Sequence, residues 1–181
     1  GACAVGAYTS VSAREAFNVE FWPLELYKLS LAPPARPGDR DWRAGEAELA
    51  REVILITGAA GGIGRAIAQR LVDAGASVVV TDLDRAVVAG LAEALNRRAG
   101  RARALGLVMD VTSERSIDSA LDATLRTFGG LDGLVSNAGV AHVAAIDRLR
   151  LAEWERSFAV NATGHFLIAR CVVRLLRAQR L

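Results

Sequence analysis

A glycine-rich segment, TGAAGGIG at residues 57–64, is the part of the sequence best suited to hold a ligand. It follows an apolar run and precedes a helical pattern, so its backbone N–H groups would lie at the positive end of a helix. A Cβ would keep a pyrophosphate away from those N–H groups, which favours a dinucleotide site over an ordinary tight turn. The contacts expected in the segment are Gly58, Gly62, Ile63 and Gly64.

An acidic residue, Asp82, ends the next apolar run, 24 residues after the first glycine of that segment. A carboxylate there accepts hydrogen bonds from both ribose hydroxyls of an adenosine and repels a 2′-phosphate. Asp84 adds to the repulsion, and the glycine segment has no Arg or Lys, although Arg65 and Arg85 are close. The pattern therefore favours NAD over NADP, with Leu83 as a further contact. Asp82 could also cap the helix that follows, and the two roles are compatible.

Apolar runs alternate with helical patterns from residue 53 onward. Continuous apolar runs predict strands that are buried on both faces, at 53–57, 77–81, 104–109 and 134–136. Periodicity and capping residues predict helices at 65–74, 86–99 and 113–128, and a long final helix from about 152. Strands that alternate with helices pair in parallel through right-handed crossovers. We therefore predict an α/β doubly wound sheet with strand order 3-2-1-4.

The sequence before the first predicted strand has a different composition. Three of the four prolines fall in 31–38, and the strongly charged stretch 39–52 follows, a combination typical of a linker. Several aromatic residues precede it, in too few residues for a core, so that part should dock on another unit. The predicted units are an arm at 1–35, a linker at 36–51 and a domain at 52–181.

Charge and composition exclude several classes of partner. The 22 basic residues are interleaved with 20 acidic ones, so no block could follow a nucleic-acid backbone. No apolar run reaches the roughly 18 to 20 residues that span a bilayer, and the N-terminus lacks a signal-peptide pattern. We expect a cytoplasmic protein without nucleic-acid or membrane partners. Cys3 and Cys171 form no cluster with His142 or His165, so we expect free thiols and no metal site.

The sequence from about residue 52 to 181 resembles the short-chain dehydrogenase/reductase family. Its glycines fit both the TGxxxGxG of that family and the TGxxGxxG of the extended, epimerase-like branch, so later motifs decide. Asp110-Val111 looks like the family's adenine-contacting pair. Asn137-Ala138-Gly139 resembles its NNAG, with Ser136 in place of the first Asn. Asn161 resembles the helix asparagine of the typical dehydrogenase branch, where that neighbourhood holds a water in a proton relay.

Each of these motifs also has a structural interpretation. Asp110 could cap the next turn, Asn137 could support the sheet, and Asn161 could be a satisfied polar group of its helix. The resemblance makes Asn161 the candidate catalytic residue of this chain. His142 and His165 are expected to be loop or core residues.

The resemblance implies a Rossmann-type fold and hydride transfer between a nicotinamide and an alcohol or aldehyde. The family uses a tyrosine as general acid/base, a lysine four residues later and an upstream serine. Here the tyrosines are Tyr8 and Tyr27 and the lysine is Lys28, so no YxxxK pair exists. We therefore expect a cofactor-binding half that is inactive alone. We also expect it to be truncated, because residues 170–181 would leave a helix face and a sheet edge uncovered. The alternative is a non-catalytic NAD-binding or interaction module.

The N-terminal arm carries a second resemblance. Its segment EAFNVEFWPLELYKL at 15–29, followed by Pro33-Pro34, resembles the joint of bifunctional rhamnulose-1-phosphate aldolase/short-chain dehydrogenase proteins. That resemblance implies a small-molecule substrate derived from a sugar. The aldolase is a metal enzyme, and residues 1–49 contain no histidine, so no such metal site is expected. By analogy with the dehydrogenase family, a homo-oligomer would form through the helix that starts near Trp154.

Overall fold

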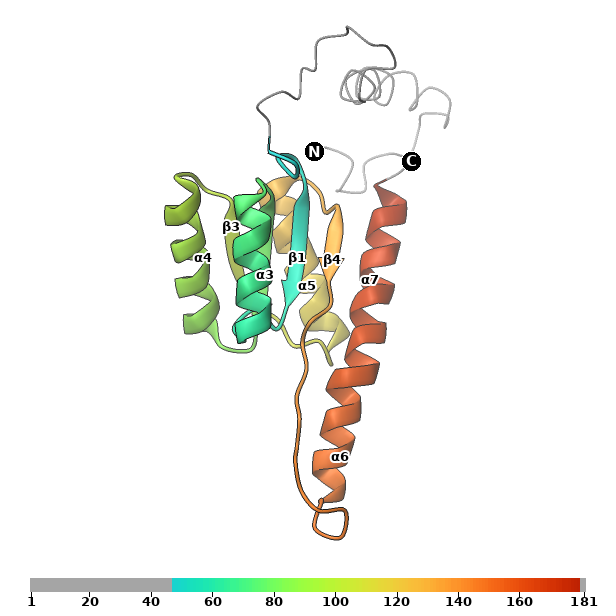
Figure 1. The fold of residues 1–181 in the computed structure, drawn as a ribbon. Helices are drawn as coiled ribbons and strands as arrows, with labels where there is room; N and C mark the ends of the chain where they lie inside the picture. The colour runs from blue at the N-terminus through green and yellow to red at the C-terminus, as the bar shows by residue number, and fades with distance from the viewer. Residues whose placement is uncertain (1–46, 180–181) are drawn as a thin grey trace, which may run out of the picture.

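The computed structural model describes residues 47–179, which form a parallel sheet with helices on both faces (Figure 1). The predicted arm at 1–35 and most of the linker lie outside the described residues. The strands are β1 (Val53–Thr57), β2 (Ser77–Asp82), β3 (Ala104–Val108) and β4 (Gly133–Val135). All pair in parallel in the order β3-β2-β1-β4, which confirms the predicted α/β class and strand order.

Helices connect the strands and cover the sheet in two layers. They are α3 (Gly62–Asp73), α4 (Arg85–Ala99), α5 (Glu114–Phe128), α6 (Leu151–Phe158) and α7 (His165–Ala178), with a π-helical turn at Ala159–Gly164. The alternation of side chains along each strand divides the core. Leu55 and Val79 pack toward α5 and α7, whereas Ile56, Val78 and Val80 pack toward α3 and α4.

Helix ends follow the capping residues in the sequence. The Ser113 side chain accepts from the Ser116 N–H and begins α5, and Gly100 and Gly129 end α4 and α5 with φ of 66° and 81°. The first helix differs from its prediction at 65–74, because α3 already begins at Gly62. Gly62 and Gly64 therefore lie in the first turn of the helix, and their N–H groups belong to its open end.

The last helical segment runs from Leu151 to Ala178 through the π-helical turn. By length and composition it could cross a membrane, and 22% of its apolar window is buried in the described structure; core helices, which are mostly buried, pass the same test of length and composition. The sequence predicted a helix from about residue 152 but not a candidate membrane span, because its apolar residues lie on helix faces rather than in one continuous run. Ile168, Cys171 and Val172 pack into the core, whereas Phe166 on the opposite face is exposed.

Candidate functional site

The glycine turn between β1 and α3 contains glycines that are required for different reasons. Gly58 has φ of +64°, and a Cβ there would lie 2.7 Å from Ala138 Cα. A Cβ at Gly64 would lie 2.5 Å from the Gly58 carbonyl oxygen. In contrast, a Cβ at Gly62 would meet no atom within 4 Å. Packing within the protein thus explains why residues 58 and 64 are glycines. It does not explain the glycine at position 62, where a bound ligand could require the space.

The first turn of α3 is open to a ligand. No side chain caps this helix, and the turn has no acidic residue. Gly62 and Ile63 are exposed there, while Gly64 is buried against the turn. An uncapped helix start with exposed N–H groups is a favourable position for a phosphate or another anion.

The Asp82 carboxylate joins the end of β2 to the glycine turn. Its Oδ2 accepts from the Ala60 N–H at 3.0 Å, and its Oδ1 accepts from the Leu83 N–H at 2.7 Å. Helix α4 is capped instead by Asp84, whose Oδ1 accepts from the N–H groups of Ala86 and Val87. Asp82 is therefore not the helix cap, and its carboxylate is fixed at the edge of the sheet.

Asp110 closes the turn after β3. Its Oδ1 accepts from the Thr112 N–H at 2.8 Å and from the Thr112 hydroxyl at 2.7 Å, and its own N–H donates to Ser116 Oγ. The structural interpretation of Asp110 is thus confirmed, while the residue still faces the cavity described below. Val111 is buried, and a Cβ at Gly164 would lie 2.8 Å from its Cγ2.

The end of β4 is fastened to the glycine turn through buried Thr57. Its Oγ1 accepts from the N–H groups of Asn137 and Ala138, both at 2.9 Å. The Asn137 amide in turn donates to the Thr57 and Gly58 carbonyls at 3.0 and 3.1 Å. Asn137 therefore supports the sheet, as its structural interpretation predicts. Thr57 was not a separate candidate, and only its place at the head of the TGxxxGxG motif could have indicated this role.

Asn161 lies in the π-helical turn and holds the chain that follows β4. Its Oδ1 accepts from the Val140 N–H at 2.9 Å, and its Nδ2 donates to the Val140 carbonyl at 2.7 Å. Both ends of the amide are used, so its side chain is a satisfied group that positions Val140. π-helical turns often occur at functional sites.

The two histidines lie outside this arrangement. His142 Nδ1 lies 3.1 Å from Ser157 Oγ, and His165 Nδ1 lies 2.6 Å from Ser136 Oγ. Within residues 47–179, no group of three or more His, Cys, Asp and Glu side chains could hold a metal ion. Cys171 is a buried free cysteine, and burial raises the pKa of its thiol.

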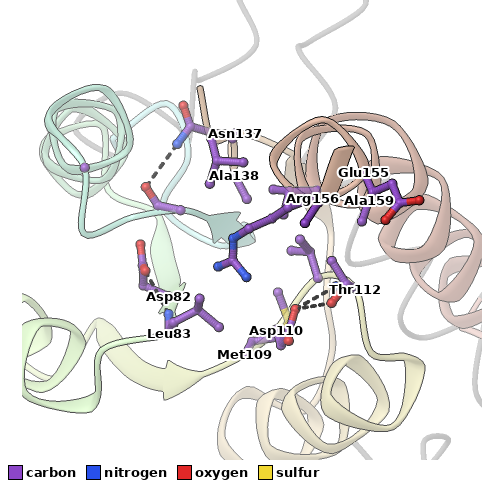
Figure 2. Close-up of a pocket in the computed structure, with 17 residues that line it drawn as sticks. Asp82, Leu83, Met109, Asp110, Thr112, Asn137, Ala138, Glu155, Arg156 and Ala159 are labelled. Carbon is purple, nitrogen blue, oxygen red and sulfur yellow. Dashed lines mark hydrogen bonds between the residues drawn. The ribbon is translucent and has the colours of Figure 1, made fainter. Parts of the chain in front are cut away.

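A cavity of about 540 Å³ lies where these segments meet (Figure 2). It is lined by eight residues expected from the sequence, which are Gly58, Asp82, Leu83, Asp110, Val111, Asn137, Ala138 and Gly139. Gly62, Ile63, Gly64 and Asn161 do not line it. One further wall was not predicted from the sequence: it is formed by α6 and the start of the π-helical turn, and it includes Ala152, Glu155, Arg156, Ala159 and Val160. Their spacing on one helix face was the available signal.

Several known proteins are similar to this chain in sequence. A family model described as short chain dehydrogenase matches residues 52–180. The oxidoreductase YuxG of Bacillus subtilis (strain 168) is 41% identical over 179 residues, which are 99% of this chain and 24% of that protein. D-threitol dehydrogenase of Mycolicibacterium smegmatis is 39% identical over 128 residues, 70% of this chain and 48% of that protein.

A solved structure has the same fold and is described as an NADH complex. The 3-ketoacyl-(acyl-carrier-protein) reductase of Brucella melitensis, complexed with NADH, superposes with a TM-score of 0.64 and 34% identity. The match covers 68% of this chain and 49% of that chain. This chain therefore spans about half the length of these two relatives and about a quarter of YuxG.

Proposed function

The chain belongs to the short-chain dehydrogenase family, and we propose that its domain is the NAD-binding half of an oxidoreductase. One observation carries the proposal: the uncapped start of α3, with open space over Gly62, adjoins a turn held by the Asp82 carboxylate. A diphosphate needs free N–H groups and room for its oxygens, and a ribose needs a fixed acceptor. The chain offers both at one edge of its sheet.

Each part of the cofactor has a matching surface. The N–H groups in the first turn of α3 would hold the diphosphate, and Asp82 would accept the adenosine ribose hydroxyls. Leu83 and Val111 offer apolar surface to the adenine, beside the turn formed by Asp110. The segment 138–140 would face the nicotinamide half. When bound, the cofactor would exchange a hydride with an alcohol or carbonyl carbon of the substrate.

The charges around β2 favour NAD over NADP. A 2′-phosphate on the adenosine ribose would lie close to the Asp82 carboxylate, with Asp84 two residues further along. Two unit charges about 4 Å apart repel by roughly 4 kcal/mol at an effective dielectric constant near 20. A ribose hydroxyl at the same place donates a hydrogen bond to the carboxylate instead.

Catalysis by this chain alone is not expected. Its sequence has no tyrosine after Tyr27 and no lysine after Lys28, and it spans about half the length of similar oxidoreductases such as D-threitol dehydrogenase. Asn161 would contribute by positioning Val140 next to the nicotinamide half, rather than by moving a proton itself. A non-catalytic NAD-binding module is the second candidate, and the same lack of a YxxxK pair favours it. Dehydrogenase activity of a longer protein carrying this sequence would distinguish the two.

The substrate is proposed to be a sugar-derived alcohol or aldehyde. A polyol enzyme, D-threitol dehydrogenase, is among the similar proteins, and the arm resembles the joint of aldolase/dehydrogenase proteins. The match to YuxG extends over almost the whole chain, so it includes the arm at 1–35 and the linker at 36–51. These residues would connect the dehydrogenase domain at 52–181 to a preceding domain.

A second copy of the chain would cover the outer face of α6 and α7. Trp154 and Phe158 lie there with ring centroids 4.7 Å apart, and Phe166 is 59% exposed with the Arg170 guanidinium 5.1 Å from its ring centre. Exposed aromatic residues gathered on one helical segment favour an interface there. Sedimentation should show a dimer that Phe166→Glu dissociates, and a wild-type monomer would contradict it.

Thermal unfolding with and without NADH tests the proposed function. A ligand present at 100 times its Kd stabilises the folded state by about 2.7 kcal/mol, which raises Tm by on the order of 10 °C. ADP-ribose, which lacks the nicotinamide, should give part of that rise. An unchanged Tm with both ligands at millimolar concentration would contradict NAD binding.

A further inference from the structure

Arg156 is the one positively charged side chain among the residues that line the cavity, whereas three lining residues are acidic. Figure 2 shows its side chain extending from α6 into the cavity, toward the wall formed by Asp82, Leu83 and Asp110. Within residues 47–179, no ion pair or side-chain hydrogen bond holds its guanidinium. An extended cation without a partner in the described structure is free to contact a ligand.

The rest of the wall formed by α6 and the π-helical turn has small side chains and no group that would compete with Arg156 for a ligand. Ala152 and Ala159 are small, and Figure 2 shows the Glu155 carboxylate pointing away from Arg156. Arg156 and Val160 are four residues apart, so they lie on the same helix face. Arg156 is therefore the residue through which α6 can reach across the cavity.

The wall opposite Arg156 carries the Asp82 and Asp110 carboxylates, and its other side chains are apolar. Leu83 is 56% exposed and lines the cavity, next to buried Met109 and Val111. A flat aromatic ring placed against this wall would have an apolar surface on one side and the guanidinium on the other. The guanidinium is planar and weakly hydrated, so it stacks on aromatic faces with favourable cation–π attraction.

We propose that Arg156 closes over the adenine of the cofactor, with its guanidinium stacked on the ring. The inference rests on the proposed NAD-binding function and deepens it, because it assigns recognition of the adenine to α6. Asp82 recognises the ribose, and the start of α3 recognises the diphosphate. The main alternative is a contact between Arg156 and a phosphate of the cofactor.

Titration of NADH into the full 181-residue chain, followed by nicotinamide fluorescence, tests this proposal. Arg156→Ala should weaken NADH binding roughly 5- to 20-fold. Arg126→Ala is the matched control, because Arg126 is exposed on α5 and does not line the cavity. It should bind within about 2-fold of the wild type. Arg156→Lys keeps the positive charge but lacks the planar guanidinium that stacks on a ring. Its affinity for NADH should therefore fall well below that of the wild type.

Displacement of NADH by the two halves of the cofactor locates the contact. Adenosine 5′-monophosphate should lose affinity in Arg156→Ala by the same factor as NADH, whereas nicotinamide mononucleotide should not. The loss of NADH affinity in Arg156→Ala should persist at high salt, since salt screens a stacking contact less than it screens a contact with a phosphate. Equal losses for both halves, full binding by Arg156→Lys, or an effect that disappears in salt would overturn the proposal. If the wild type and Arg156→Ala bind NADH equally well, the role of Arg156 is overturned but the proposed function is not. If the wild type does not bind NADH at all, the proposed function and the role of Arg156 are both overturned.

Discussion

Replacing Gly62 by alanine separates ligand binding from folding more cleanly than any other change in the glycine turn. Gly62 is the first residue of α3, it has no positive φ, and a Cβ there meets no protein atom within 4 Å. The folded protein should therefore accept the methyl group, and alanine's higher helix propensity stabilises it by up to about 1 kcal/mol. The diphosphate of the cofactor should not accept it, because the methyl group would occupy the open space at the start of α3, where the diphosphate is proposed to lie.

The expected loss follows from the hydrogen bonds that the methyl group prevents. A charge-assisted hydrogen bond contributes roughly 1.5 to 3 kcal/mol, so losing one should weaken NADH binding about 10- to 100-fold. Gly90→Ala is the matched control, because Gly90 is also an exposed helical glycine with open space around its Cβ, but it lies in α4 away from the cavity. Urea unfolding and fluorescence titration measure the two effects separately.

Two results would refute this reasoning. If Gly62→Ala binds NADH as tightly as Gly90→Ala, the diphosphate does not lie at the start of α3. If Gly62→Ala lowers the free energy of unfolding by several kcal/mol, the space around Gly62 is not open to a methyl group. Gly64→Ala shows the contrasting behaviour that packing predicts: its Cβ would lie 2.5 Å from the Gly58 carbonyl, so this variant should lose stability.

Three further predictions concern residues around the cavity. Asp82→Asn should narrow the preference for NADH over NADPH by roughly 10-fold or more, as measured by paired titrations, and an unchanged ratio would show that Asp82 does not read the ribose. Thr57→Val should lower the free energy of unfolding in urea by about 2 to 4 kcal/mol, because two backbone N–H groups lose their acceptor; a loss near zero would contradict that role. Cys171 should be alkylated only after unfolding, because burial both shields its thiol and raises its pKa; mass spectrometry showing rapid labelling of the native chain would argue against this.

The elements that the sequence predicted well are those determined by local patterns. The apolar runs of β1 and β2 and the capping residues Ser113 and Gly129 act within a few residues, so the sequence alone locates them. The βαβ alternation predicted parallel pairing, and the strand order was taken by analogy with doubly wound sheets; the structure confirms both. The start of α3 was predicted three residues too late, because glycines are typical of loops and the sequence does not show that Gly62 and Gly64 are helical.

The features that the sequence did not predict depend on three-dimensional approach. The spacing of the motif could not tell that packing requires Gly64 and that only a ligand would require Gly62. The sequence suggested Asp82 as a possible cap of α4, whereas the structure shows that Asp84 caps it. Arg156 was missed because its role depends on how α6 passes the cavity, which is determined by contacts far from it in sequence.

The central claim is that the cavity between the glycine turn, β2 and the turn after β3 holds one NAD molecule. Isothermal titration of NADH into the wild-type chain tests it most directly. We predict saturable binding of one NADH per chain, with NADPH weaker. Titration without saturable heat, or NADPH binding as tightly as NADH, would contradict the claim.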